Sequence, residues 1–246
     1  MNMANPSKRV ALITGAGRRI GACIAEYLHQ HGWSVVIHCN RSKDEADVLS
    51  HRLNQQRTDS TKVFAADLTQ KQANQSLIQQ TIDWAGQLDL LVNNASLFIP
   101  SAFDDTNDEL LNTLFAINVQ APFWLSLAAR QSLAKQQGAI INITDIHAET
   151  PLKGYAEYCQ TKAALTMQTK ALAREFAPEI RVNAIAPGAI TWPEHGNRLS
   201  TSQQRAIIDK TLLKGHGEPV FIAQALLALV NNPFITGQTL RVDGGR

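Results

Sequence analysis

The chain has 246 residues, a formal net charge of +2, and hydrophobic and charged contents of 44% and 18%. This composition is ordinary for a soluble globular protein and excludes a disordered chain. The net charge is small and its basic residues are scattered, which excludes nucleic acid as the main partner. The length is compatible with a single α/β domain.

Cysteine and histidine spacing gives no sign of a disulfide framework or a metal site. The three cysteines are Cys23, Cys39 and Cys159. They are far apart and lack CxxC spacing, which favours a reducing compartment. His147, His195 and His216 lack ligand spacing, so we assign no metal. The start of the chain lacks a signal peptide and no apolar run is long enough to cross a bilayer, so we expect a cytoplasmic protein with no membrane partner.

Short apolar runs rich in β-branched residues recur along the chain, each followed by a stretch with helical periodicity. These runs cover residues 10–14, 35–39, 62–66, 88–92, 139–143 and 181–185, and a last one covers 238–242. Continuous apolar strands favour a parallel sheet with helices on both faces, because neither face then meets water. We find no linker or repeat, and predict one α/β domain over residues 1–246, a doubly wound parallel sheet of the Rossmann type.

A glycine-rich turn follows the first predicted strand. Gly15, Gly17 and Gly21 lie in this turn, which opens a helix that continues through Leu28. Glycines let the backbone approach a pyrophosphate, whose charge then meets the free N–H groups of the helix start. The GxGxxxG spacing differs from the usual fingerprint, so a plain strand-to-helix turn is the alternative. The predicted cofactor contacts in this turn are Gly15, Arg18, Arg19 and Ile20.

The second predicted strand ends in Asn40, Arg41 and Ser42, where an enzyme that prefers NAD usually carries Asp or Glu. Arg41 can make a forked contact with a 2′-phosphate, and its neighbours can add hydrogen bonds, which predicts NADPH as the cofactor. The alternative for Arg41 is a solvated turn residue. Asp67 and Leu68, after the third predicted strand, are also predicted to bind the cofactor.

Tyr158 and Lys162 are one helical turn apart, so in a helix both side chains share a face. A lysine ammonium lowers the pKa of a nearby phenol and makes it a better proton donor, and the same lysine can hold the cofactor ribose. Tyr155 is the rival tyrosine, disfavoured because Cys159, four residues later, supplies no charge. A Tyr-xxx-Lys pair alone often arises by chance, but its position after five predicted strands favours a catalytic pair.

Taken together, these motifs resemble the short-chain dehydrogenase/reductase family over nearly the whole chain. The matching segments are Thr14-Gly15 to Gly21, Asn93-Asn94-Ala95, Asn118, Tyr158-xxx-Lys162 and Pro187-Gly188. The resemblance implies that Asn94 and Ala95 border the cofactor and that Pro187 and Gly188 lie beside the nicotinamide. It also implies that Asn118 helps to hold a proton-relay water, although Asn118 could instead satisfy backbone groups inside a helix. A homotetramer or a homodimer is implied as well.

Two residues differ from those usual in the family and indicate a subgroup within it. The family usually has a serine thirteen residues before the tyrosine, where this chain has Asp145, and a glycine in the phosphate turn, where it has Arg19. With the segment 94–98 and Leu152-xx-Tyr155, these residues are similar to pteridine reductases, including the bacterial dihydromonapterin reductase-like members. The resemblance implies NADPH-dependent reduction of a dihydropterin, or of a folate or biopterin relative, to the tetrahydro form.

The implied chemistry requires a proton on nitrogen as hydride reaches carbon. Asp145 can hydrogen-bond Tyr158 or the pterin nitrogens and take part in passing the proton. Its carboxylate opposes formation of tyrosinate whereas Lys162 favours it, and the sequence leaves open which effect dominates. Phe98 is predicted to stack on the pterin ring, with Ser96 and Arg19 as polar contacts to the pterin or the cofactor phosphates. An ordinary core aromatic is the alternative for Phe98.

The least regular region, residues 188–204, is predicted to be a mobile lid in which Trp192 and His195 shape the substrate pocket. Two other functions stay open. The first is a carbonyl or 3-ketoacyl reductase of the same family, in which Asp145 merely replaces the serine. The second is a catalytically silent protein that senses NADPH, against which the intact Tyr158, Lys162 and Asn118 argue.

Overall fold

The computed structural model describes residues 9–101, 107–193 and 198–246. Seven parallel strands form one sheet in the order β3-β2-β1-β4-β5-β6-β7. The strands are β1 (Val10–Ile13), β2 (Ser34–Cys39), β3 (Thr61–Ala65), β4 (Leu90–Asn93), β5 (Ala139–Ile143), β6 (Arg181–Pro187) and β7 (Thr239–Val242). The predicted single-domain, doubly wound α/β fold is confirmed.

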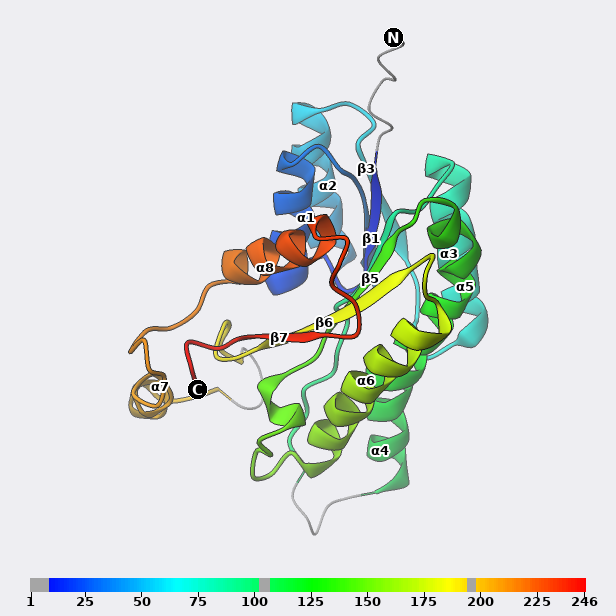
Figure 1. The fold of residues 1–246 in the computed structure, drawn as a ribbon. Helices are drawn as coiled ribbons and strands as arrows, with labels where there is room; N and C mark the ends of the chain where they lie inside the picture. The colour runs from blue at the N-terminus through cyan, green and yellow to red at the C-terminus, as the bar shows by residue number, and fades with distance from the viewer. Residues whose placement is uncertain (1–8, 102–106, 194–197) are drawn as a thin grey trace.

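Helices cover both faces of this sheet, with α1, α2 and α8 on one side and α3, α5 and α6 on the other (Figure 1). The α-helices are α1 (Arg19–Gln30), α2 (Lys43–Gln56), α3 (Lys71–Ala85), α4 (Asp108–Phe115), α5 (Ala121–Lys135), α6 (Ala156–Glu175), α7 (Thr201–Ile208) and α8 (Pro219–Asn231). A π-helical turn, η2 (Ala116–Gln120), joins α4 to α5, and a 3-10 turn, η3 (Ile146–Ala148), follows β5.

The strands explain why the core forms two layers. Every residue of β1 is buried, and its side chains alternate between the two faces. Ile13 packs into the layer under α1, α2 and α8, whereas Leu12 packs into the layer under α3, α5 and α6. A strand covered in this way must be apolar throughout, which is why the continuous apolar runs predicted the sheet.

The helices α4 and α5 form one continuous helical stretch, Asp108–Lys135, because η2 joins them without a break. Among the described residues it is the one helix that is long and apolar enough, by length and composition, to cross a membrane. The prediction that no apolar stretch is long enough to cross a bilayer is therefore wrong for this helix by length and composition alone. Leu125, Ala129 and Leu133 are buried in the layer shared with α3 and α6, as in a core helix of a globular protein.

The end of the predicted lid, residues 188–204, is helical rather than irregular. Helix α7 begins at Thr201, after a capping box in which Ser200 and Gln203 satisfy each other's backbone N–H groups. The movement of the segment as a lid stays a prediction. His195 lies outside the described residues, so its predicted role has no structural counterpart.

Candidate active site

The glycine turn lies at the carboxyl end of β1, between β2 and β4, where the strand order reverses. Doubly wound sheets bind ligands at this point. Gly15 has a φ of +62°, and a Cβ there would lie 2.9 Å from the Cα of Ala95. A Cβ on Gly17 would lie 2.5 Å from the Oγ of Ser42. Only glycine permits these approaches, which bring the turn against two loops predicted to bind the cofactor.

A hydroxyl fastens the turn to β4. Thr14 Oγ1 accepts hydrogen bonds from the backbone N–H groups of Asn94 and Ala95, both at 3.0 Å. The Asn94 side chain donates in return to the backbone oxygens of Thr14 at 2.8 Å and Gly15 at 3.1 Å. Asn94 therefore positions the turn. No pattern in the sequence predicts this role of Thr14, whose one signal is a hydroxyl directly after an apolar strand.

The start of α1 suits a diphosphate. Its N-cap, Arg18, makes no side-chain capping bond, and the first turn of the helix contains no acidic residue. The first N–H groups of the helix therefore have no capping side chain, and the positive end of the helix dipole meets no carboxylate from its own first turn. Arg18, Asn40 and Arg41 are exposed beside the turn, and Ser42 is half-buried against Gly17. The residues present fit a nicotinamide dinucleotide with a 2′-phosphate.

Arg19 lies in the turn but reaches across the site. Its φ is +57°, a conformation that favours glycine, the residue usual at this position. Its Nη2 donates to Thr191 Oγ1 at 2.6 Å and to the backbone oxygen of Trp192 at 3.1 Å. The structure thus links the phosphate turn to the segment after β6.

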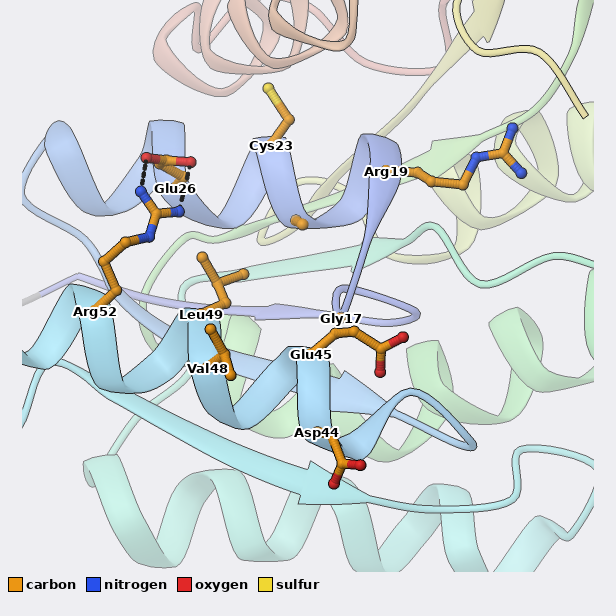
Figure 2. Close-up of a pocket in the computed structure, with 10 residues that line it drawn as sticks. Gly17, Arg19, Cys23, Glu26, Asp44, Glu45, Val48, Leu49 and Arg52 are labelled. Carbon is orange, nitrogen blue, oxygen red and sulfur yellow. Dashed lines mark hydrogen bonds and ion pairs between the residues drawn. The ribbon is translucent and has the colours of Figure 1, made fainter. Parts of the chain in front are cut away.

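A cavity of about 550 Å³ lies between α1 and α2, and Gly17 and Arg19 of the turn form part of its lining. Arg19 points away from the other residues that line it, and Glu26 and Arg52 form an ion pair at its side (Figure 2). Asp44 and Glu45 add two carboxylates to the lining. This charge makes the cavity a poor phosphate site, in contrast to the turn beside it.

Tyr158 and Asp145 form a direct pair. The hydroxyl of Tyr158 donates to Asp145 Oδ2 at 2.7 Å, while Asp145 Oδ1 accepts from the backbone N–H of His147 at 2.8 Å. That second bond caps η3 and fixes the carboxylate. Burial, followed by the charge and the hydrogen bond of Asp145, raises the pKa of Tyr158 well above its ordinary value. Tyr158 therefore keeps its proton at neutral pH.

Lys162 is buried one turn farther along α6. Its Nζ donates to the backbone oxygen of Ile143 at 3.0 Å and lies 5.6 Å from the ring centre of Tyr158. Burial lowers the pKa of Lys162 to about 8, against an opposing effect of Asp145. Burial and Asp145 both raise the pKa of Tyr158, and the phenol stays protonated.

Asn118 sits in the π-helical turn η2, fully buried. Its Oδ1 accepts from the backbone N–H of Leu97 at 2.8 Å and from Ser96 Oγ at 3.1 Å. Its Nδ2 donates to the oxygen of Leu97 at 3.0 Å and to Thr161 Oγ1 at 3.0 Å. Asn118 therefore holds the segment after β4 against α6, and its part in a proton relay stays a prediction.

Aromatic rings lie beside Tyr158. Phe98 stacks on Tyr155, with ring centres 4.4 Å apart and planes 10° apart, and meets Tyr158 edge-on at 4.8 Å. Phe98 is 37% exposed, so it is not an ordinary core aromatic. Trp192, within the predicted lid, stacks on His216 with ring centres 4.5 Å apart.

The remaining predicted cofactor residues lie around the same end of the sheet. Pro187 ends β6, and a Cβ on Gly188 would lie 2.7 Å from the Cα of Asp243. The carboxylate of Asp67 accepts from the N–H and hydroxyl of Thr69, while the side chains of Leu68 and Ile20 pack into the two core layers. Leu68 and Ile20 can therefore offer a cofactor mainly their backbone.

Fold and site together define an oxidoreductase that uses a dinucleotide. The model of the family described as enoyl-(acyl carrier protein) reductase matches residues 15–246. A 3-oxoacyl-(acyl-carrier-protein) reductase FabG of Rickettsia prowazekii is 34% identical over 99% of this chain and 98% of that protein. The chain belongs to this family of short-chain dehydrogenases/reductases.

Two solved structures are similar over nearly the whole chain, both with a TM-score of 0.90. One is a blue fluorescent protein from a metagenomic library in complex with NADPH, 29% identical and covering 98% of each chain. The other is FolM alternative dihydrofolate reductase 1 from Brucella canis complexed with NADP, 34% identical, covering 97% of this chain and 94% of that chain.

Proposed function

We propose that this protein is an NADPH-dependent pteridine reductase that reduces a dihydropterin, or a dihydrofolate or biopterin relative, to its tetrahydro form. The observation that carries the proposal is the 2.7 Å bond from the Tyr158 hydroxyl to Asp145. A carboxylate replaces the serine usual in the family, and burial together with this carboxylate raises the pKa of the phenol. The likeness to a FolM alternative dihydrofolate reductase supports a substrate of this class.

The cofactor side of the proposal follows from the turn. The backbone of Gly15 to Ile20 and the start of α1 hold the diphosphate, while Arg41, with Asn40 and Ser42, holds the 2′-phosphate. Asp67, Leu68, and the segment from Asn94 to Ser96 border the nucleotide, and Pro187 and Gly188 border the nicotinamide. When bound, NADPH supplies a hydride to the substrate carbon. Solved neighbours contain NADPH or NADP, which supports this cofactor.

The protein's own groups handle the proton. Tyr158 Oη donates its proton to a substrate ring nitrogen as that nitrogen becomes basic, and is left as tyrosinate. Lys162 stabilises the tyrosinate, because its ammonium lies near the ring. Asp145 orients the hydroxyl, and a proton from solvent restores the phenol before the next cycle. A carbonyl substrate has no need of a carboxylate at this position.

The substrate side is built from a flat surface and polar groups. The exposed face of Phe98 suits a planar heterocycle, since its other face is stacked on Tyr155. Ser96, two residues before Phe98, is an exposed residue whose hydroxyl donates to Asn118. Arg19 supplies a guanidinium at the far edge, where it bonds Thr191.

A second candidate, a 3-ketoacyl reductase, is favoured by the FabG relative at 34% identity. That identity equals the one with the FolM structure, so overall similarity does not separate the two functions. The two functions are separated by incubating the protein with NADPH and either a dihydropterin or a ketoacyl thioester, and identifying the product by chromatography. The proposal expects a tetrahydropterin in a one-to-one ratio with NADPH consumed, and its absence under conditions where a ketoacyl thioester is reduced would favour the second candidate.

We extend the proposal to assembly and compartment. The C-terminal part of the chain exposes large apolar side chains, with Phe234 99% exposed and Leu213 80% exposed. Such surface is typical of an interface between copies, and supports a homotetramer or homodimer, which sedimentation of the purified protein tests. The unpaired cysteines and the NADPH requirement support the cytoplasm.

A further inference from the structure

His38 is a polar residue inside an otherwise apolar strand. It lies in β2, is 1% exposed, and has hydrogen-bond partners at both ring nitrogens. Its Nδ1 lies 3.1 Å from the backbone nitrogen of Gly15, and its Nε2 lies 3.1 Å from the backbone oxygen of Ala66. An amide N–H can only donate and a carbonyl can only accept. The ring must therefore be neutral, with its proton on Nε2.

The two partners belong to different walls of the cofactor site. Gly15 opens the phosphate turn, and Ala66 stands directly before Asp67 and Leu68, at the end of β3. Backbone bonds run beside the ring, from Ala16 N to His38 O at 2.8 Å and from Ala66 N to Cys39 O at 3.0 Å. The imidazole thus completes a cross-link between the turn and the loop after β3.

We propose that His38 is a positioning residue for the dinucleotide. It touches neither cofactor nor substrate, but holds the Gly15 turn and the loop after β3 at the separation that the adenosine half requires. Burial lowers the pKa of His38 to about 4, so the tautomer that makes both bonds persists at neutral pH. The inference rests on the cofactor in the proposed function and is independent of its substrate.

The test is direct binding of NADPH and of adenosine 2′,5′-bisphosphate to full-length variants. His38→Phe keeps a flat ring and removes both bonds. It leaves two buried backbone groups unpaired, which predicts a loss of affinity of at least ~10-fold for both ligands. His38→Asn retains an acceptor near the Nδ1 position and His38→Gln retains a donor near the Nε2 position, so both should lie between wild type and His38→Phe. Turnover at saturating NADPH should stay near wild type, because the reacting groups are untouched.

His29→Phe is the matched control. His29 is also a buried histidine, bonded to Ser60 at 2.7 Å, but it sits near the other end of α1. This variant should lower the melting temperature and leave both affinities unchanged. Nitrogen-15 NMR of labelled histidine adds a readout that needs no turnover, and should show His38 protonated at Nε2 alone.

The outcomes separate the two proposals. If wild type fails to bind NADPH, the proposed function fails. If wild type binds and a folded His38→Phe binds equally well, the positioning role is wrong. An equal loss of affinity in His29→Phe would also overturn it, since the effect would then be one of general stability. If His38→Phe does not fold, wild-type affinity in both His38→Asn and His38→Gln contradicts the proposal.

Discussion

The chemistry of the site depends on three side chains that modify one another. Burial and Asp145 raise the pKa of Tyr158, while burial lowers the pKa of Lys162 to about 8. The phenol therefore keeps its proton until a substrate nitrogen becomes basic, and the carboxylate bonded to the phenol fixes the position of its hydroxyl. These effects operate over a few ångströms, so they can be tested one residue at a time.

Asp145→Asn preserves the size of the side chain and removes its charge. We expect turnover of a dihydropterin to fall by ~10²- to 10⁴-fold, the usual contribution of a proton-transfer group. NADPH affinity, measured by fluorescence titration, should not change. Glu149→Gln is the control, because it removes an exposed carboxylate four residues later that pairs with Arg241. Unchanged turnover in Asp145→Asn removes the main support for a pterin substrate.

The pH dependence should report Lys162. Its ammonium is fully present below its pKa of about 8 and is lost above it. We therefore expect kcat/KM for reduction to fall as the pH rises through about 8, since the developing tyrosinate loses its nearby positive charge. A pH profile of NADPH oxidation measures this. A rate that stays level well above that pH would show that the charge of Lys162 is not required.

At the scale of elements, the turn between β1 and α1 organises the cofactor side. It is in contact with the loop after β4 through Gly15 and with the loop after β2 through Gly17. Its shape depends on close backbone approach as well as on a positive φ. The two requirements can be separated by comparing Gly15 with Gly86, because both have a positive φ but only Gly15 is closely approached by other atoms.

Gly15→Ala should weaken NADPH binding by at least ~10-fold, equivalent to about 1.4 kcal/mol, and also lower the free energy of unfolding. The added Cβ would meet Ala95 at 2.9 Å. Gly86→Ala is the matched control, because Gly86 has a φ of +79° and nothing within 4 Å of the added atom. It should cost about 1–2 kcal/mol of unfolding free energy from backbone strain alone and leave NADPH binding intact. Urea unfolding and fluorescence titration measure both quantities. Equal effects of the two variants on binding would refute the close-approach argument.

The loop after β2 should set the choice between NADPH and NADH. Arg41→Ala removes a charge-assisted contact worth roughly 1.5–3 kcal/mol, so the Kd of NADPH should rise by ~10- to 150-fold while that of NADH stays constant. Arg52→Ala, on the following helix, removes an arginine that pairs with Glu26 and should alter neither. If NADPH binding survives in Arg41→Ala, Arg41 is a solvated turn residue.

At the scale of the whole molecule, the sequence predicts the sheet well because its signals are local. The apolar runs mark all seven strands, but β4 starts at Leu90 rather than at residue 88. Leu88 is buried, yet its N–H bonds the Ser132 hydroxyl instead of a neighbouring strand. The apolar side chain of Leu88 suggests that it belongs to the strand. Only its hydrogen bond to Ser132, a residue distant in sequence, shows that it does not.

The site is predictable only in part, since its decisive contacts join distant segments. The residue types at positions 145, 158 and 162 indicate a catalytic group, but no pattern in the sequence shows how deeply Tyr158 is buried or that burial raises its pKa. The role of His38 depends on the register between β2, the turn and β3, so it was overlooked. A histidine in a buried apolar strand was the available signal, because such a side chain needs partners.

The most direct test of the central claim is the ratio of kcat/KM for a dihydropterin to that for a 3-ketoacyl thioester, measured on one preparation by NADPH oxidation. We expect the dihydropterin to be the better substrate by ~10-fold or more, since the pair of Asp145 and Tyr158 serves protonation of nitrogen. A ratio in favour of the ketoacyl thioester would contradict it and assign the protein to the carbonyl-reducing members of its family.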